Sequence, residues 1–258
     1  MQLGGAAVTV SSALLEVEDI TKRFGGIVAL DGLNLTLKPG ELRCILGPNG
    51  CGKTTLFNVL TGAFKPTSGR VRFRGEVISG KGPVAISRRG ISRKFQVPGI
   101  FPDLTAQQNI ALPMAAASRK PTVRTLVRRA PDPARLAELL DFAGLSDKAD
   151  MLASDLAHGE KQRLEVAMLL AVDADLLLLD EPTAGMSKGE TASIAALIRK
   201  LTSDFGKTVL VIEHDMQFVR ALDCPITVMA RGAVIAGGTY DEVRSNPQVI
   251  ECYLGRAA

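Results

Sequence analysis

A glycine-rich segment, GPNGCGKT at residues 47–54, constrains this chain of 258 residues more than any other feature. It matches the pattern G-x-x-x-x-G-K-[ST] of a phosphate-binding loop, and it lies between the apolar runs RCIL and TTLFNVLTG. In such a loop the backbone N–H groups turn toward a phosphate, and the N-terminus of the next helix adds partial positive charge. We therefore expect a strand, a loop and a helix in this order, with Lys53 binding phosphate oxygens and Thr54 offering a hydroxyl to Mg²⁺.

The pattern around the loop predicts strands of two kinds. Segments 14–24 and 28–46 alternate apolar and polar residues, which indicates antiparallel strands joined by turns, and 69–78 adds a short strand pair. By contrast, 175–180 and 207–215 are continuous apolar runs, as expected for parallel strands buried on both faces.

The rest of the chain supplies helices and one more strand pair. Segment 189–206 has the pattern of a connecting helix, 225–238 is typical of a hairpin, and 97–172 is mostly helical in character. The predicted fold class is α/β: a P-loop NTPase core with a mostly parallel sheet, an N-terminal antiparallel β subdomain and an inserted helical subdomain.

The composition of the chain bears on its partners and on its location in the cell. With 31 basic and 27 acidic residues the net charge is +4, which is too mild to predict nucleic acid as a partner. Nine basic residues gather between Arg88 and Arg129, where either a solvated surface or contact with anionic lipid accounts for them. No apolar run reaches the ~18 to 20 residues of a membrane span, and no Lys or Arg precedes Lys22, so we expect a cytoplasmic chain.

The four cysteines show no metal-binding spacing, which predicts reduced thiols. One of them, Cys51, lies inside the phosphate loop. Because Lys53 and a helix N-terminus both favour a thiolate, we expect this thiol to be reactive.

Polar residues follow the two apolar runs at the point where each ends. Asp180 and Glu181 close the segment LLLLDEP, and His214 closes VIEH. Ligands bind at the carboxyl ends of strands in open α/β sheets. We expect Asp180 to support Mg²⁺ through a water, Glu181 to polarise an attacking water and His214 to contact the γ-phosphate. The alternatives are a solvated strand end and a structural histidine.

The order of these motifs resembles the ATP-binding subunit of ABC transporters over residues 14 to 255. The resemblance implies a single ATPase domain over 12–256, with a core formed by 12–96 and 173–256 and a helical subdomain over 97–172. It implies ATP and Mg²⁺ as cofactors, with Lys53, Glu181 and His214 catalytic and Thr54, Gln96 and Asp180 near the metal. The implied nucleotide contacts are Phe24, stacked on adenine, and Gly47, Pro48, Asn49, Gly50, Cys51, Gly52, Lys53, Thr54, Thr55, Gln96, Ala157, His158, Gly159 and Glu160.

The family's signature motif, LSGGQ, falls on Leu156 to Glu160 and departs from the usual pattern. Ala157 lacks the serine hydroxyl that binds the γ-phosphate of the opposite subunit, a bond worth roughly 1.5 to 3 kcal/mol. His158 replaces a glycine, and Glu160 replaces the glutamine. Ser187 stands where many members carry an aspartate that couples the two ATP sites. We expect a weakened signature and unequal ATP sites.

The resemblance also implies partners: two transmembrane permease subunits, a second ATP-binding subunit in a head-to-tail dimer and, indirectly, a periplasmic solute-binding protein. It places the chain peripherally on the cytoplasmic face of the inner membrane. Segments such as HGEKQRLE (158–165) and EHDMQFV (213–219) resemble the branched-chain amino acid and urea importers, closest to the urea-importer ATP-binding subunit. The alternatives are a non-transport ABC ATPase and a regulatory nucleotide-binding module.

Overall fold

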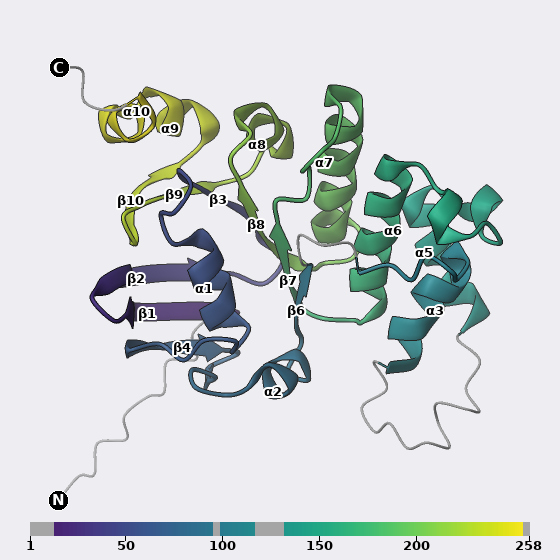
Figure 1. The fold of residues 1–258 in the computed structure, drawn as a ribbon, viewed down its shortest axis with the longest axis horizontal. Coiled ribbons are helices and arrows are strands. Elements are labelled where there is room, and N and C mark those ends of the chain that lie inside the picture. Colours follow the sequence, from purple (N-terminus) through teal and green to yellow (C-terminus); the bar gives the residue numbers. More distant parts are fainter. Residues whose placement is uncertain (1–12, 95–98, 117–131, 255–258) are drawn as a thin grey trace, which may run out of the picture.

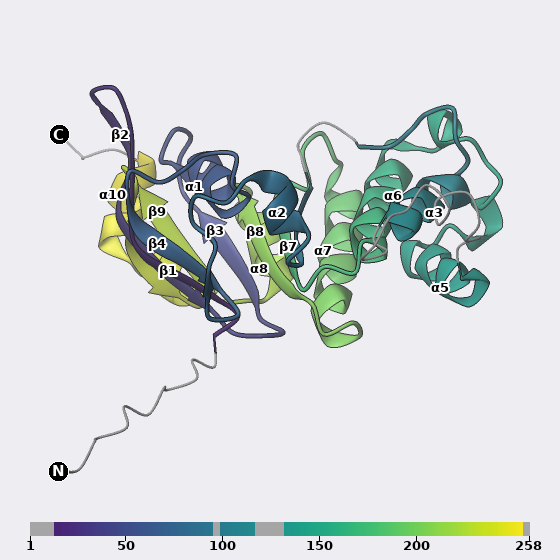
Figure 2. The same cartoon turned by 90° about the horizontal axis from the view of Figure 1, so that it is seen from below.

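The computed structural model describes residues 13–94, 99–116 and 132–254, in which two β-sheets and a group of helices lie side by side (Figures 1 and 2). The first sheet is antiparallel, with strand order β2-β1-β4-β5. Its strands are β1 (Leu15–Phe24), β2 (Ile27–Leu37), β4 (Ser68–Phe73) and β5 (Glu76–Val77). The strands predicted in 14–24 and 69–78 are confirmed.

The second sheet has strand order β10-β9-β3-β8-β7-β6 and is parallel except for β10. Its strands are β3 (Leu42–Leu46), β6 (Ile91–Lys94), β7 (Leu176–Asp180), β8 (Thr208–Glu213), β9 (Ile226–Ala230) and β10 (Ala233–Gly238). The antiparallel expectation for 28–46 is wrong for its last part. The chain leaves the first sheet after β2, and β3 pairs in parallel with β8 and β9 of the second sheet. Alternation alone could not show this, since it does not identify the neighbouring strand.

Helices cover the second sheet and extend beyond it (Figure 1). They are α1 (Lys53–Leu60), α2 (Pro83–Ser87), α3 (Ala106–Ala116), α5 (Pro133–Ala143), α6 (His158–Ala171), α7 (Lys188–Ser203), α8 (Met216–Leu222), α9 (Tyr240–Ser245) and α10 (Pro247–Leu254), with short 3₁₀ turns at Ser146–Lys148 and Ala153–Asp155. Three of them, α3, α5 and α6, lie between β6 and β7 in the chain and pack against one another, as expected for a helical insertion. No helix in the described ranges is long and apolar enough to cross a membrane.

The apolar run of β7 is explained by two hydrophobic cores. Leu177 and Leu179 belong to the core formed with α3, α5, α6, α7 and α8, whereas Leu176 and Leu178 belong to the core formed with α1 and the antiparallel sheet. Successive side chains of a strand point to opposite faces. Because both faces of β7 are covered, every position of this strand is apolar until Asp180 at its end.

We expect Leu178→Ala to lower the free energy of unfolding by about 2 to 5 kcal/mol, because Leu178 is fully buried and truncation leaves a cavity. Leu112→Ala on α3 is the matched control, since Leu112 is 43% exposed. Urea unfolding followed by circular dichroism compares the two. Equal midpoints would contradict burial of β7 on both faces.

Candidate nucleotide site

The phosphate-loop segment connects β3 to α1 and approaches other backbone so closely that only glycine fits at two positions. A Cβ on Gly47 would lie 2.3 Å from the carbonyl oxygen of Met229 in β9. A Cβ on Gly52, whose φ is +108°, would lie 2.4 Å from the carbonyl oxygen of Ala29 in β2. The first turn of α1 has no side-chain cap and no acidic residue. These features suit an anion bound by backbone N–H groups, so the loop fits a nucleotide phosphate.

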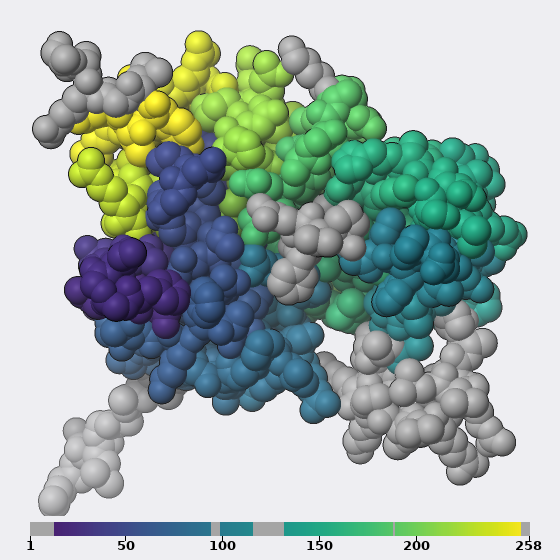
Figure 3. All heavy atoms as spheres, in the orientation of Figure 1, coloured from purple at the N-terminus to yellow at the C-terminus, as the bar shows by residue number. Residues whose placement is uncertain are grey.

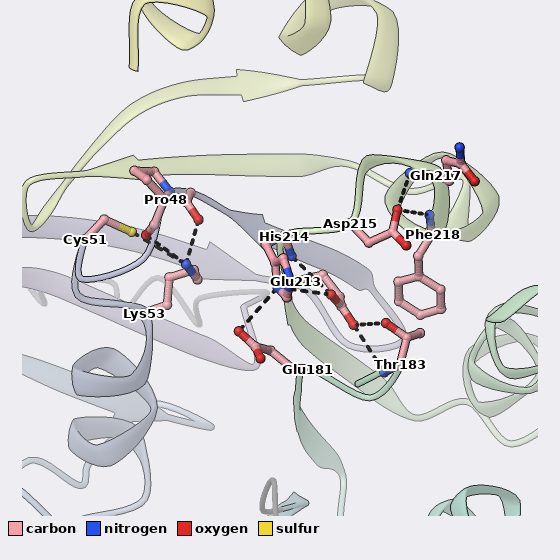
Figure 4. A network of polar contacts seen from close by, with 11 residues as sticks. Pro48, Cys51, Lys53, Glu181, Thr183, Glu213, His214, Asp215, Gln217 and Phe218 are labelled. Atoms are coloured by element: carbon pink, nitrogen blue, oxygen red, sulfur yellow. Dashed lines mark hydrogen bonds and ion pairs between the residues drawn. The ribbon is translucent and has the colours of Figure 1, made fainter. Parts of the chain in front are cut away.

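Lys53, the first residue of α1, directs its ammonium group back into this loop (Figure 4). Its side chain is buried, and Nζ donates hydrogen bonds to the carbonyl oxygens of Gly47 at 2.6 Å and Pro48 at 3.0 Å. Thr54 beside it is exposed and Thr55 is half-buried. The loop therefore presents a cation and a hydroxyl on adjacent residues, as a phosphate with Mg²⁺ requires.

Cys51 is buried inside the loop, and burial raises the pKa of its thiol above the ordinary value. Lys53, whose Nζ lies 4.0 Å from the sulfur, acts in the opposite direction but is the smaller effect. Burial therefore opposes the reactive thiolate that the sequence predicts. The sequence shows the neighbouring lysine but not the loss of water around the sulfur.

Glu181 and His214 meet where β7 and β8 end, as the parallel pairing of these strands requires (Figure 4). The Nδ1 atom of His214 lies 3.4 Å from Oε1 of Glu181. Glu181 has φ of +45°, and its backbone N–H donates to the carbonyl oxygen of Ile212. This left-handed conformation turns the chain away from the strand directly after Asp180.

Glu213, at the buried end of β8, connects the segments that follow β7 and β8. Its side chain is fully buried, and Oε1 accepts hydrogen bonds from the hydroxyl of Thr183 at 2.6 Å and its backbone N–H at 3.2 Å. Oε2 accepts the backbone N–H of His214 at 3.1 Å. Glu213 thereby links the segment after Glu181 to the residue that carries the imidazole, a role that the sequence analysis missed. An acidic residue at the end of an apolar run, directly before a histidine, was the available signal.

Asp180 is also buried, and its Oδ2 forms an ion pair of 2.5 Å with Arg93 Nη2 from β6. No cluster of three or more His, Cys, Asp or Glu side chains suited to a metal occurs in the part of the chain that the structure describes. Mg²⁺ would then be held by Thr54, by phosphate oxygens and through Asp180, consistent with its preference for nucleotide oxygens and water. Gln96, the other expected metal contact, lies outside the described residues.

Phe24, the expected adenine contact, ends β1 with 42% of its surface exposed. Its ring packs edge-on against Phe64 at 5.2 Å between centroids, and Lys22 Nζ lies 4.8 Å from its centre. An aromatic ring that is packed against a neighbour and remains partly exposed suits stacking on a purine.

The signature segment forms the N-terminus of α6. Ala157 is the N-cap and offers no side-chain oxygen, so half of the usual capping arrangement is missing. Glu160 supplies the other half, because its Oε2 accepts the backbone N–H of Ala157 at 3.1 Å. Ala157 and His158 are exposed, Gly159 is buried, and His158 Nε2 lies 3.4 Å from the carbonyl oxygen of Ala184.

Lys148 neutralises the carboxylate that this motif carries in place of an amide. Its Nζ lies 2.6 Å from Glu160 Oε1, and this contact is the main reason that the pKa of Glu160 is below its ordinary value. Lys148 could not be identified from sequence, because it lies twelve positions before Glu160 and no local pattern connects the two residues.

The predicted residues thus fall into two groups. One group lies at the carboxyl ends of the parallel strands β3, β7 and β8, and it consists of the phosphate loop, Asp180, Glu181 and His214. The other group is the signature segment, which lies on the helices. In the space-filling view the N-terminal strands and the helical group occupy opposite ends of the molecule (Figure 3).

Comparisons with known families and proteins agree with this geometry. The family described as ABC transporter matches residues 30–184, and the family described as branched-chain amino acid ATP-binding cassette transporter matches residues 233–258. The chain is 40% identical to the high-affinity branched-chain amino acid transport ATP-binding protein BraF of Pseudomonas aeruginosa, over 96% of this chain and 100% of that protein. It is 37% identical, with the same coverage, to LivG of Escherichia coli, which has the same description.

Solved structures show the same fold. The ADP conformation of MJ1267, an ATP-binding cassette of an ABC transporter, has a TM-score of 0.81 and 31% identity, with 95% of this chain and 99% of that chain covered. The dimeric post-hydrolysis state of the ATP-binding cassette MJ0796, bound to ADP and Pi, has a TM-score of 0.71 and 29% identity, with 88% and 98% covered. This chain belongs to the ABC transporter family and is an ATP-binding subunit with the ABC ATPase fold.

Proposed function

We propose that this chain hydrolyses ATP to power an importer of branched-chain amino acids, in association with two permease subunits at the cytoplasmic face of the membrane. One observation above all supports this proposal: Glu181 and His214 meet at the ends of adjacent strands, on the same side of the sheet as the phosphate loop. The match of residues 233–258 and the similarity to BraF and LivG support the choice of solute.

In the proposed reaction the chain binds and orients the nucleotide before it moves a proton. Phe24 stacks on adenine, the backbone N–H groups of 47–54 bind phosphate oxygens, and Lys53 exchanges its carbonyl partners for the β- and γ-phosphates. Bound Mg²⁺ supplies charge stabilisation at the phosphates. Glu181 accepts the proton of the attacking water, and His214 donates a hydrogen bond to the γ-phosphate.

The signature serves a second copy or a paralogue rather than its own loop. We assign the backbone N–H groups at the start of α6 to the γ-phosphate held by the opposite subunit in a head-to-tail dimer. Ala157 makes this contact weaker than a serine would, and the Lys148–Glu160 pair keeps the motif close to neutral.

Urea is the second candidate solute. It rests on the sequence of segments 158–165 and 213–219, which includes the signature and the strand end at His214. The ATPase subunit does not contact the solute, so uptake of labelled leucine and of labelled urea into vesicles that contain this chain and its own permeases decides between the two. A periplasmic solute-binding protein is the proposed donor in that assay.

Glu181→Gln is expected to retain ATP binding while turnover falls on the order of 10²-fold or more, because the amide cannot accept the water's proton. Phosphate release and nucleotide binding are measured on the same preparation. The control is Glu138→Gln, an exposed carboxylate on α5 whose partner is Arg135. Near-normal hydrolysis by Glu181→Gln would remove this residue from the proposed role.

Lys148→Met is expected to lower turnover about 5- to 30-fold, the factor that corresponds to 1 to 2 kcal/mol, because the carboxylate of Glu160 near the partner's γ-phosphate then keeps only its longer contact with Arg163, at 3.8 Å. The pKa of Glu160 would rise toward its ordinary value of 4.5, so Glu160 stays charged at neutral pH. Adding Glu160→Gln removes that charge and should restore turnover. A double variant as slow as Lys148→Met would contradict charge compensation at the signature.

A further inference from the structure

Arg93 joins three elements of the site through one buried guanidinium group. It lies on β6, and its side chain is 7% exposed. Nη2 binds Oδ2 of Asp180 on β7 at 2.5 Å, and Nη1 donates to Oδ1 of Asn58 on α1 at 2.6 Å. The guanidinium carbon lies 5.4 Å from the centre of the Phe57 ring, also on α1.

We propose that Arg93 is a positioning residue for the Mg²⁺-nucleotide complex: it fixes the carboxylate of Asp180 relative to α1, the helix that begins with Lys53 and Thr54. The inference rests on the proposed role of Asp180 near Mg²⁺. Arg93 itself contacts neither metal nor nucleotide in this role, and it acts through Asp180.

The geometry requires arginine rather than any cation. The planar guanidinium holds its five N–H groups in fixed directions, so one side chain binds a carboxylate and an amide oxygen at the same time through its two terminal nitrogens. Lysine has a single ammonium group on a flexible stem and cannot reproduce both directions with equal definition. Since Phe57 packs near the guanidinium, the plane of the group is supported as well as its position.

Fixing one oxygen of a carboxylate fixes the other. Because Arg93 holds Oδ2, rotation of the Asp180 carboxylate is restricted, and Oδ1 keeps one direction. The bond to Asn58 transmits this restraint to α1, on which Thr54 lies. The metal would therefore meet two groups whose spacing is set by a third residue, which lies 87 residues before Asp180 in the chain.

The test measures how much Mg²⁺ strengthens ADP binding to the full-length protein, by titration calorimetry with Mg²⁺ and with EDTA. Arg93→Met is expected to reduce this Mg²⁺-dependent gain about tenfold, while metal-free ADP affinity changes by less than about twofold, because a charge-assisted contact to Asp180 is lost. Arg93→Lys should retain part of the gain. The control, Arg43→Met, removes a partly buried arginine on β3 that pairs with Glu41.

Asn58→Leu leaves the ion pair in place, so it tests the restraint even if Arg93→Met does not fold. It is expected to reduce the gain about threefold, and to have no further effect when combined with Arg93→Lys or Arg93→Met, because Asn58 acts only through Arg93. An unchanged gain in Asn58→Leu, or additive losses in the double variant, would overturn the positioning role.

Asp180→Asn separates this inference from the proposed function. If Asp180→Asn loses the Mg²⁺-dependent gain and Arg93→Met keeps it, the positioning role of Arg93 is contradicted, whereas the proposed role of Asp180 near Mg²⁺ is supported. If Asp180→Asn keeps the full gain, the proposed role of Asp180 is overturned, and that of Arg93 with it.

Discussion

Strands β7 and β8 are covered by apolar side chains on both faces, and this burial governs where charge can lie in the molecule. Asp180 and Glu213 are the last residues of these strands, and they are 2% and 0% exposed. An isolated buried carboxylate is costly, so each needs partners. Asp180 has Arg93, and Glu213 has Thr183 and the backbone N–H of His214. These pairings account for the polar residues that gather at the ends of β7 and β8, beside the phosphate loop.

Much of this arrangement could be predicted from sequence because it is local. The phosphate loop, the apolar strands and the residues at their ends are consecutive in the chain, and parallel pairing brings the strand ends together. The pairing of β3 and the burial of Cys51 could not be predicted, since both depend on neighbours distant in sequence. The same holds for Arg93 and Lys148, whose partners are identified only by the fold. The domain bounds, the role of Gln96 and urea as the solute stay predictions.

The signature segment illustrates how a motif can lose a side chain and keep its shape. Ala157 removes a hydroxyl, yet α6 still begins at His158, because Glu160 accepts the N–H of the N-cap residue. That compensation introduces a negative charge at the helix N-terminus that we propose binds a γ-phosphate, and Lys148 offsets this charge. Departures at 157 and 160 therefore belong to one local arrangement that includes a residue outside the motif.

The left-handed backbone of Glu181 sets function against stability at a single position. An L-residue in this left-handed conformation is less stable than in the right-handed one by roughly 1 to 2 kcal/mol, and φ of +45° places Glu181 there. Glycine or asparagine would adopt the same turn with less strain, but neither carries a carboxylate. Random mutation with selection for thermal tolerance alone would favour such replacements, whereas the role proposed for Glu181 in hydrolysis requires that selection for turnover retain the strained glutamate. Resistance to heat and the catalytic role proposed for Glu181 are thus opposed at this residue by its backbone geometry.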